Sequence, residues 1–562
     1  MKTNLEIAYI LAYILFSKHD AQIVDIVEKG DYFFVNFLSE KKISKLDFTT
    51  IEKEISSFAN KKNKWQIKKL EEKYFETNNF IKDELAKKPC DLMVQCNNFF
   101  FPFFHQNDKK LDFSSPFFFV LDNVSGVYWR GDAKNIQLQE ITGFAFSTQQ
   151  ELVKFKTELQ ERKEIDHRKI GQELELFTFN DLVGKGLPIW LPNGTIIKTQ
   201  IENRVHEILE KNEYQFVQTP VLGSDNLYKT SGHWQHYREN MFSPISIDDE
   251  KFVLRPMTCP HHMIVYLSKN HSYRDLPFRI AEHAILHRYE PTGSLIGLER
   301  VRSMQLVDTH VIISLEQIAT EIKHCYETIK ECLNCFHIDF HSIDLSLHDP
   351  KNKQKFFDNE EMWNIAESTL EKCCQQLKFN FIKKIGEAAF YGPKIDFQIK
   401  TVLGHIVTIS TIQLDFLLPK KFNLLYKDKS GGFSCPILIH GGIIGTFERF
   451  LSILLEQTKG VLPLWLVPQQ VVIIPVNDAH LEYCHKLFNT FKEQKIRVFV
   501  DCSNERIAKK IRNANIRKIP YQVVIGNNEI ENDLISYRCY AKTTVNQCKI
   551  STLIDLIKSS CK

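Results

Sequence analysis

One cysteine and two histidines in the middle of the chain could together bind a metal ion. Cys259 lies in RPMTCP, His310 in VDTHVI and His440 in LIHGGIIGTFERF. A thiolate and two imidazoles suit zinc, and three protein ligands leave a fourth position open to a substrate. The chain has 14 Cys and 20 His, so the trio alone is weak evidence, because each residue could equally be a buried cysteine or a hydrogen-bonded core histidine. The segments around the trio therefore decide its interpretation.

Arginines around the trio are spaced in a way that suits a polyphosphate. Arg288 and Glu290 precede the turn signal PTGS, and Arg300 and Arg302 follow it. Two strands joined by this turn would bring the arginines to one face, where guanidinium groups can bind phosphate oxygens. In GTFERFLSILLE, Arg449 lies near the start of a predicted helix that follows a glycine. The pattern around PTGS favours a site for a polyphosphate.

The elements that must position these residues belong to a chain of several domains, because 562 residues suggest three or four. We predict a small α+β domain over residues 1–145 and a solvated linking helix over 146–172. Residues 173–463 contain long strand-rich segments with few strand-helix alternations, which predicts an antiparallel sheet carrying helices. Residues 468–562 alternate strands and helices and predict a compact α/β domain.

Local patterns refine two of these domains. LPNGTI contains an Asn-Gly turn signal, and the apolar residues Ile197, Ile201, Val205, Ile208 and Leu209 then recur at helical spacing. A strand, YQFVQTPVL, follows that helix and contains Pro220. Near the N-terminus, the run from Ile7 to Phe16 has the length of a signal-peptide core, but Glu6 precedes it and no small-residue cleavage site follows. We predict an amphipathic domain helix there.

Composition limits the partners of the protein. The 72 basic and 69 acidic residues nearly balance, so a nucleic-acid contact must come from a local patch. The tail segment NERIAKKIRNANIRKI is basic and could be either a solvated face or an RNA contact. The 14 cysteines suggest free thiols in a reducing compartment, and no stretch is long enough to span a bilayer. We expect a soluble, cytoplasmic protein that does not bind membranes.

Together, the helix-strand-Pro unit, the Arg-x-Glu-loop-Arg segment and Gly-x-x-Glu-Arg resemble motifs 1, 2 and 3 of class II aminoacyl-tRNA synthetases. Within that class, MTCP, KTSGHW, SYRDLPFRIAE, AFYGPKIDF and TIQLDF resemble threonyl-tRNA synthetase, over roughly residues 120–545. The resemblance implies a multidomain α+β fold, with a class II antiparallel-sheet catalytic core and an α/β anticodon-binding domain. It also implies a homodimer that uses ATP, L-threonine and tRNA(Thr), with Mg2+ bound to ATP.

The resemblance further implies a role for each matching residue in the binding of ATP. Arg288 would hold the α-phosphate and the substrate carboxylate, and Glu290 would contact the adenine amino group. Arg300 would bind the terminal phosphates, and Arg449 would stack on the adenine. Met304 stands where an aromatic residue usually faces the adenine, and a thioether covers a ring less well.

The threonine pocket and the tRNA contacts are implied in the same way. One Zn2+ per chain would be bound by Cys259, His310 and His440, and the substrate's amino group and hydroxyl would complete its coordination. A metal that requires this hydroxyl rejects valine, which a hydrophobic pocket separates from threonine by only about a hundredfold. The other implied residues are Asp308 for the hydroxyl, Tyr391 near the amino group, Lys394 and Gln413 in the pocket wall, His233 near the tRNA ribose, and Asn504, Arg512, Glu529 and Arg538 for the anticodon.

Some positions depart from the family pattern. Leu306 replaces a polar residue near the reacting carboxylate, and Thr258 and His261 replace Asn and Gly around Cys259. His261 and His262 could act as unwanted metal ligands. Gly441 and Gly442 follow His440 and are expected to loosen the start of a helix by about 1 kcal/mol.

Bacterial threonyl enzymes usually carry an editing domain that hydrolyses seryl-tRNA with an HxxxH motif and a later Cys-x-x-x-His. Leu5 and Tyr9 occupy the two histidine positions here, and Cys96 and His105 lie in a phenylalanine-rich stretch without the second motif. Without these groups, little remains to activate water. We predict a degenerate domain that does not edit, and we expect the still earlier ubiquitin-like module to be missing.

Two alternatives remain on the residues alone. A non-catalytic synthetase-like protein is disfavoured by the retained arginines and zinc trio. A prolyl or seryl enzyme shares the class II motifs; the trio disfavours the prolyl enzyme, and a seryl enzyme with zinc stays open.

Overall fold

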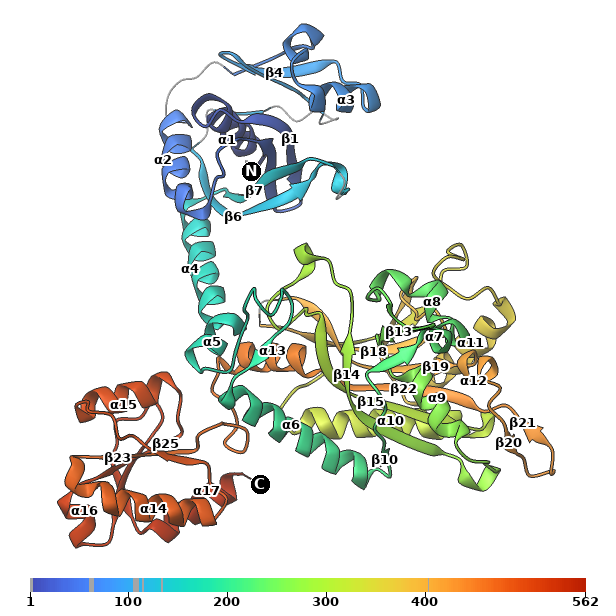
Figure 1. The fold of residues 1–562 in the computed structure, drawn as a ribbon. Coiled ribbons are helices and arrows are strands. Elements are labelled where there is room, and N and C mark those ends of the chain that lie inside the picture. Colours follow the sequence, from blue (N-terminus) through green and yellow to red (C-terminus); the bar gives the residue numbers. More distant parts are fainter. Residues whose placement is uncertain are drawn as a thin grey trace. The chain divides into compact units, whose positions relative to one another are not determined.

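The computed structural model describes residues 4–59, 65–104, 111–113, 116–132, 135–402 and 404–561. The chain divides into two compact units, Met1–Arg162 and Lys163–Lys562, and the boundary falls inside helix α4 (Gln149–Ile165) (Figure 1). The finer division into four parts stays a prediction. Among the described residues, no helix is both long enough and apolar enough to cross a membrane.

The first unit is an α+β domain in which helix α1 (Asn4–Lys18) contacts both a four-stranded antiparallel sheet, ordered β1-β2-β7-β6, and strand β5 of a second sheet, ordered β3-β4-β5. Because α1 is covered on several sides, its apolar residues are buried around its circumference, and the prediction of an amphipathic helix was wrong. The other elements of this unit are β1 (Gln22–Lys29), β2 (Tyr32–Leu38), α2 (Phe48–Ala59), β3 (Gln66–Lys69), α3 (Asn79–Lys87), β4 (Leu92–Cys96), β5 (Phe99–Pro102), β6 (Phe118–Tyr128) and β7 (Gln137–Phe146).

An eight-stranded sheet forms the centre of the second unit. Its order is β10-β14-β15-β22-β19-β18-β16-β17, and only the two edge pairs, β10 with β14 and β16 with β17, are parallel. The predicted antiparallel sheet is therefore confirmed. Its strands are β10 (Gln215–Phe216), β14 (Phe278–His287), β15 (Ser303–Ile313), β16 (Ser342–Leu347), β17 (Phe381–Ile385), β18 (Lys394–Lys400), β19 (Ile406–Asp415) and β22 (Ile437–Thr446).

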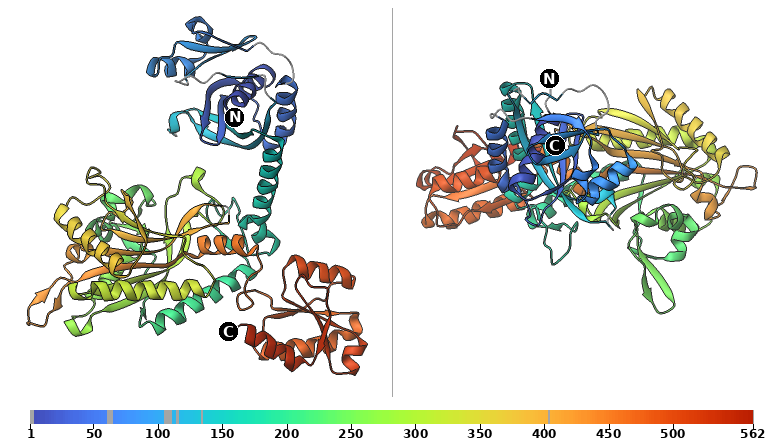
Figure 2. Two further views of the ribbon diagram at one scale, coloured as in Figure 1. Left: turned by 180° about the vertical axis from the view of Figure 1, so that it is seen from behind. Right: turned by 90° about the horizontal axis from the view of Figure 1, so that it is seen from above.

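Helices α6 (Pro192–Lys211), α10 (Ile318–Asn334) and α13 (Phe447–Thr458) bury their apolar faces in the core of this sheet. Figures 1 and 2 show α6 and α10 side by side. The five apolar residues predicted at helical spacing in α6 are all buried. The Asn-Gly signal was wrong, because Pro192 begins the helix and Gly194 lies within it. A Cβ at Gly194 would lie 1.9 Å from the Leu176 carbonyl oxygen, so the close approach requires glycine there.

We predicted one solvated helix over residues 146–172, but the structure has two helices there. Helix α4 ends at Ile165, and Asp166 caps a second helix, α5 (His167–Glu173), by accepting a 2.8 Å hydrogen bond from the Arg168 backbone N–H. His167 and Ile170 are buried against the second unit's core. The charge density that suggested a solvated helix holds only for α4.

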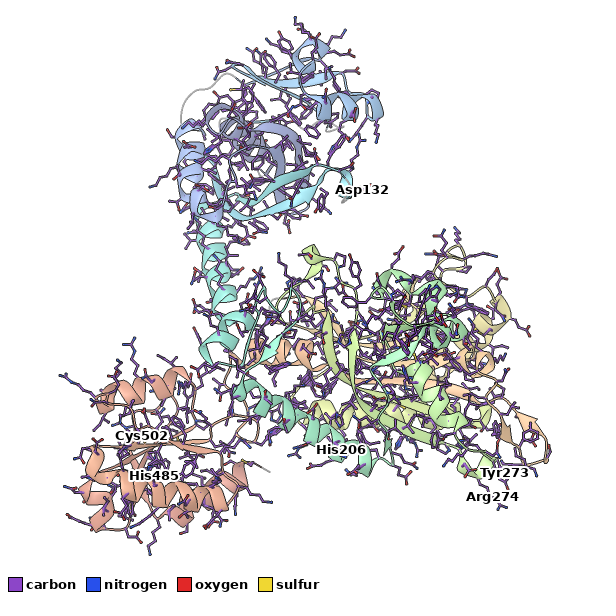
Figure 3. The ribbon with its side chains drawn as sticks, viewed as in Figure 1. Asp132, His206, Tyr273, Arg274, His485 and Cys502 are labelled. Carbon is purple, nitrogen blue, oxygen red and sulfur yellow. The ribbon has the colours of Figure 1, made fainter. Side chains whose placement is uncertain are left out.

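The C-terminal part of the second unit has the alternating pattern predicted for it. Its sheet is ordered β24-β23-β25-β26-β27, with the first three strands parallel and the last two antiparallel to their neighbours. All 14 cysteines have free thiols, and Cys502 of this part is exposed (Figure 3). The elements are β23 (Val471–Pro475), α14 (Leu481–Glu493), β24 (Val498–Val500), α15 (Ile507–Ile516), β25 (Tyr521–Ile525), α16 (Asn527–Glu531), β26 (Ile535–Cys539), β27 (Asn546–Cys548) and α17 (Ile550–Ser560).

Candidate active site

Strand register brings the predicted metal and pocket residues into one row. His310 of β15 pairs with His440 of β22, His440 pairs with Gln413 of β19, and Gln413 pairs with Lys394 of β18. Paired residues on neighbouring strands present their side chains to the same face of a sheet. Cys259 begins helix α9 (Cys259–Leu267) and supplies the thiol from outside the sheet.

The trio fits a metal ion in its donor set and its packing. The ligand atoms of Cys259, His310 and His440 all lie within 4.8 Å of one another, and all three residues are buried. Burial raises the pKa of the Cys259 thiol well above 9, and the carboxylates of Asp308 and Asp415 raise it further. Burial also lowers the pKa of His310 well below 6.5. A bound cation would compensate the two carboxylates and stabilise the thiolate.

Hydrogen bonds assign the ring nitrogens that remain for a metal. The Nε2 atom of His440 lies 3.0 Å from Asp415 Oδ2, and the Nδ1 atom of His310 lies 2.8 Å from His262 Nδ1. His440 Nδ1 and His310 Nε2 are left facing each other at 2.9 Å. Carboxylate and imidazole partners of this kind commonly orient metal-binding histidines. His262 therefore lies behind His310 and is not positioned as an unwanted ligand.

Glu282 extends this arrangement into the protein. Its carboxylate accepts hydrogen bonds from His262 Nε2 at 3.0 Å and from Thr219 Oγ1 at 2.7 Å, and it pairs with Arg255 at 2.9 Å. Burial alone would raise its pKa, but the bonds from His262 and Thr219 and the charge of Arg255 lower that pKa to about 2. Glu282 is therefore ionised, and through its hydrogen bond to His262 it fixes the tautomers of His262 and His310.

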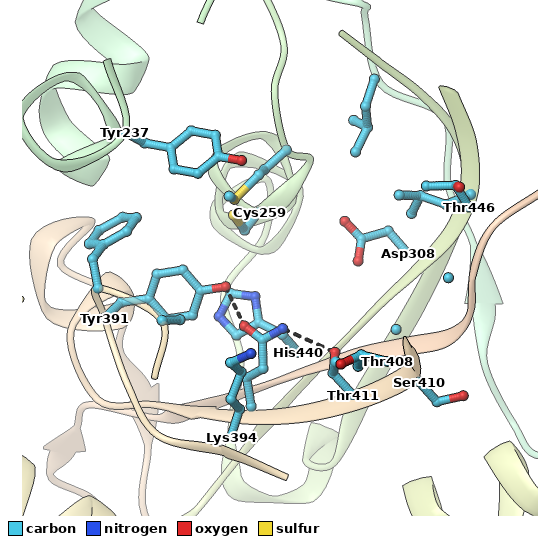
Figure 4. Close-up of a pocket in the computed structure, with 18 of the residues that line it drawn as sticks. Tyr237, Cys259, Asp308, Tyr391, Lys394, Thr408, Ser410, Thr411, His440 and Thr446 are labelled. Carbon is cyan, nitrogen blue, oxygen red and sulfur yellow. Dashed lines mark hydrogen bonds between the residues drawn. The ribbon is translucent and has the colours of Figure 1, made fainter. Parts of the chain in front are cut away.

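A cavity of about 420 Å³ opens beside the trio. Figure 4 shows Cys259, Asp308, Tyr391 and His440 around the same space. Eight of the residues predicted from the sequence are among those that line it: Cys259, Arg288, Asp308, Tyr391, Lys394, Gln413, His440 and Arg449. The remaining predicted residues of this region, His233, Glu290, Arg300, Met304 and His310, lie outside its lining.

Contacts within the cavity wall hold the polar residues in place. The Tyr391 hydroxyl donates a 2.5 Å hydrogen bond to Gln413 Oε1, and the Tyr391 ring stacks on His440 with centroids 4.6 Å apart. Lys394 pairs with Asp396 at 2.8 Å. Asp308 accepts a hydrogen bond from the Thr258 hydroxyl through Oδ2. Thr258, which departs from the family pattern, thus positions the carboxylate predicted to bind the substrate hydroxyl.

The predicted nucleotide half of the site gathers cations. Arg449 donates from Nε to the Glu299 carbonyl oxygen at 3.1 Å, and Arg300 pairs with Glu290 at 2.9 Å. Burial lowers the pKa of Arg449, and repulsion from Arg288 and Arg300 lowers it further. Arg449 is therefore close enough to feel the charges of Arg288 and Arg300, and an anion bound beside it would relieve this repulsion.

Arg302, which the sequence grouped with Arg300, has a different place. Its guanidinium donates to the carbonyl oxygens of Glu290 at 2.9 Å and Lys185 at 3.2 Å. Arg302 thus fixes the turn between β14 and β15 and is not directed into the cavity.

Two predicted residues are buried beside the cavity. Met304 packs with Ala284, Leu286 and Val301, while Leu306 lines the cavity itself. His233 lies with its Nδ1 2.8 Å from Ser231 Oγ and its Nε2 3.6 Å from Cys259 Sγ. Burial lowers the pKa of His233 to about 3, so its ring is neutral.

Sequence patterns missed part of the cavity wall. His236, Tyr237, Met257 and Phe390 also line it, and the His236 ring stacks on Phe390 with centroids 5.4 Å apart. His236 and Tyr237 lie in SGHWQHY, which is dense in aromatic and imidazole groups, and Met257 and Phe390 lie within the motifs MTCP and AFYGPKIDF.

We expected Gly441 and Gly442 to lie at the start of a helix. This was wrong, because both residues belong to β22 and helix α13 begins only at Phe447. A Cβ at Gly441 would lie 2.3 Å from the Thr309 hydroxyl oxygen, which donates to the Gly441 carbonyl. Glycine is needed there because the neighbouring strand approaches closely.

The four residues predicted to read the anticodon lie on separate elements. Asn504 follows β24 and Glu529 lies in α16 after β25, so both occupy the carboxyl-terminal edge of the parallel strands. Arg512 is exposed on α15, and Arg538 pairs with Gln522 near the opposite edge. Glu529 is held by Ser536 Oγ at 2.7 Å. Their role in anticodon recognition stays a prediction.

Known proteins resemble this chain over most of its length. Residues 242–458 match the class II core domain of tRNA synthetases (G, H, P, S and T), and residues 470–560 match an anticodon binding domain. The threonine-tRNA ligase of Ureaplasma parvum serovar 3 is 53% identical over 439 residues, which cover 78% of this chain and 76% of the relative. That of Mycoplasmoides gallisepticum is 50% identical over 445 residues, 78% of each chain. A crystal structure described as the RNA binding domain of threonyl-tRNA synthetase from Cryptosporidium parvum is 34% identical, with a TM-score of 0.66, over 70% of this chain and 98% of that one.

Proposed function

This chain belongs to the threonine-tRNA ligases, which are class II aminoacyl-tRNA synthetases, and we propose on that basis how its cavity activates L-threonine and charges tRNA(Thr). The observation that carries the proposal is the meeting of two groups in one cavity. Cys259 and His440 of the trio border the same space as Arg288 and Arg449. An amino acid held by the first group would lie beside a nucleotide held by the second.

Adenylate formation needs position and charge more than a protein nucleophile. The threonine carboxylate attacks the α-phosphorus of ATP in line, and pyrophosphate leaves. Arg288 neutralises charge on the α-phosphate and the carboxylate, while Arg300 binds the terminal phosphates. Arg449 stacks on the adenine, and Glu290 accepts from the adenine amino group. Mg2+ enters with ATP as the partner of its phosphates.

The threonine pocket recognises the amino group and the hydroxyl together. Cys259, His310 and His440 would hold Zn2+, which supplies a Lewis-acid position for these two groups when it is bound. Asp308 accepts from Thr258 through Oδ2, so that its Oδ1 accepts a hydrogen bond from the substrate hydroxyl. Tyr391 approaches the amino group, because its own hydroxyl is held toward the cavity by Gln413. Valine lacks the second oxygen and is rejected.

The first test compares amino acids and metal content. ATP-pyrophosphate exchange should proceed with threonine and far less with proline, and strong preference for proline or serine would contradict the proposal. His310→Ala should reduce bound zinc from about one per chain to none and abolish threonine activation while the unfolding temperature stays within a few degrees. Full activity of that variant would exclude a metal that faces the substrate, and an unfolded variant would point to a structural metal site.

The tRNA contacts and the assembly complete the proposal. His233, neutral and next to Cys259, lies near the terminal ribose of tRNA, and the anticodon is read by residues of the C-terminal part: Asn504, Arg512, Glu529 and Arg538. The enzyme works in the cytoplasm as a homodimer, as motif 1 of class II enzymes normally builds a dimer interface. Light scattering should give twice the mass of the chain, and Arg512→Ala should raise KM for tRNA without changing threonine activation.

The N-terminal domain is proposed not to clear serine from tRNA. Leu5 and Tyr9 are buried in α1, and burial raises the pKa of the Cys96 thiol to about 11, which keeps it unreactive. His105 lies outside the described residues. Both groups of His, Cys, Asp or Glu that lie close enough to hold a metal, among the described residues, involve residues beyond 162. Seryl-tRNA(Thr) made separately should survive incubation with the enzyme, and rapid enzyme-dependent release of serine would contradict the proposal.

A further inference from the structure

A buried histidine outside the cavity connects the two segments that carry the predicted ATP-binding arginines. His167 is the first residue of α5 and only 2% exposed. The Leu298 backbone N–H donates to its Nε2 at 3.1 Å, and its Nδ1 lies 2.7 Å from Glu456 Oε1. Because a backbone amide can only donate, Nε2 is the acceptor and the proton is on Nδ1, which donates to the Glu456 carboxylate.

Both partners of His167 lie next to the nucleotide half of the cavity. Leu298 immediately precedes Glu299, whose carbonyl holds Arg449 Nε, and Arg300, which pairs with Glu290. Glu456 lies in the last turn of α13, the helix that carries Arg449 in its first turn. Figure 1 shows α5 beside α13. One imidazole thus joins the loop before β15 to α13.

The loop is built to reach this histidine. Gly297 has φ +45°, and a Cβ there would lie 2.3 Å from His167 Nε2. Leu298 is buried in the core of the unit. Asp166, His167 and Glu456 also lie close enough together to suggest a metal site, but both ring nitrogens of His167 already take part in hydrogen bonds, so the cluster is better explained as a clamp.

We propose that His167 is a positioning residue for ATP: by accepting from the Leu298 amide while donating to Glu456, it fixes residues 297–300 relative to α13 and so sets the spacing of Arg300 and Arg449. The inference rests on the proposed binding of ATP by these arginines. The three residues of this clamp, His167, Leu298 and Glu456, are not among the residues that line the cavity. Loss of the clamp therefore weakens ATP use and leaves threonine recognition unchanged.

Two conservative variants separate the two hydrogen bonds. A glutamine carboxamide reaches the position of Nε2, whereas an asparagine carboxamide ends near Nδ1. His167→Asn should raise KM for ATP in pyrophosphate exchange about fivefold to tenfold, the effect of one lost hydrogen bond, with KM for threonine within about twofold of the wild type. His167→Gln keeps an acceptor for Leu298 and loses the side-chain donor to Glu456, but the backbone N–H of residue 167 still donates to Glu456 Oε1 at 3.4 Å and keeps the link to α13. This variant should therefore retain an ATP KM within about twofold of the wild type.

A second measurement follows the hydrogen bond itself. Amide hydrogen exchange in the peptide around Leu298 should become faster in His167→Asn and stay near the wild-type rate in His167→Gln. His271 provides a matched control, because it is a buried histidine of the same unit whose Nε2 lies 2.8 Å from the Tyr266 carbonyl oxygen. His271→Phe should lower the unfolding temperature without changing KM for ATP.

The outcomes distinguish this inference from the proposed function. Arg449→Ala should raise KM for ATP strongly, and an unchanged value would contradict the assignment of the arginines. If Arg449→Ala has its effect but His167→Asn changes KM for ATP no more than His271→Phe does, the clamp is only structural and the inference is wrong. Equal increases of KM for ATP and threonine in His167→Asn would also overturn it.

Discussion

Replacement of Glu282 by glutamine tests the arrangement behind the metal trio. Glu282 is 1% exposed and pairs with Arg255, which is 2% exposed. A pKa lowered from 4.5 to about 2 corresponds to about 3 kcal/mol of stability. Because the folded pKa is the lower one, this stability is present above pH 4.5 and is lost as the pH falls through about 2.

Glu282→Gln should therefore destabilise the enzyme by about 3–5 kcal/mol at pH 7, because the buried Arg255 loses its counter-charge. It should also weaken zinc binding about tenfold to a hundredfold, because His262 no longer has a carboxylate to orient it behind His310. Urea unfolding measures the first effect. Competition for zinc with a coloured chelator, in the absence of urea, measures the second effect.

Glu321→Gln is the matched control for this experiment. Glu321 is 3% exposed and forms two 2.8 Å hydrogen bonds with Arg279, and it has no contact with the trio. This variant should lose a similar amount of stability and keep the zinc affinity of the wild type. If Glu282→Gln loses no more zinc affinity than Glu321→Gln, the relay through His262 is refuted. A loss of stability below about 1 kcal/mol would refute the buried-charge argument.

Three further variants test other parts of the structure. Burial raises the pKa of Glu448 to about 7, so the stability that is present below pH 4.5 is lost as the pH rises through 7. Glu448→Gln should therefore be up to about 3 kcal/mol more stable than the wild type at pH 8, and equally stable near pH 4. Urea unfolding at both pH values measures this difference. Gly441→Ala should cost about 1–3 kcal/mol, because its Cβ would displace the Thr309 hydroxyl; an unchanged unfolding midpoint would contradict the close packing. Tyr9→His should cost about 2–4 kcal/mol by placing an imidazole in the apolar core, and measurable hydrolysis of seryl-tRNA by it would show that the domain needs only that one group.

Much of the fold could be predicted from short-range patterns in the sequence. The apolar spacing in α6 depends only on the period of a helix, and the strand-helix alternation of residues 468–562 depends on local propensity, so both were predicted correctly. The Asn-Gly signal failed because Pro192 begins a helix whose third residue packs on the Leu176 carbonyl oxygen. The amphipathic prediction for α1 failed because a sequence does not say how many sides of a helix are covered.

The sequence by itself determined which chemical groups are available: the metal trio, the arginines and the motifs that match threonyl-tRNA synthetase. Only the tertiary structure decided how they are held. His310 and His440 are 130 residues apart, and the register of two strands brings their ring nitrogens to 2.9 Å. His262, which looked like an unwanted ligand, lies between Glu282 and His310 and forms a hydrogen bond with each. His167 lies in DHRKIG, which resembles the family, but its contacts could not be predicted, because they come from a loop and a helix that pack against it from far along the chain.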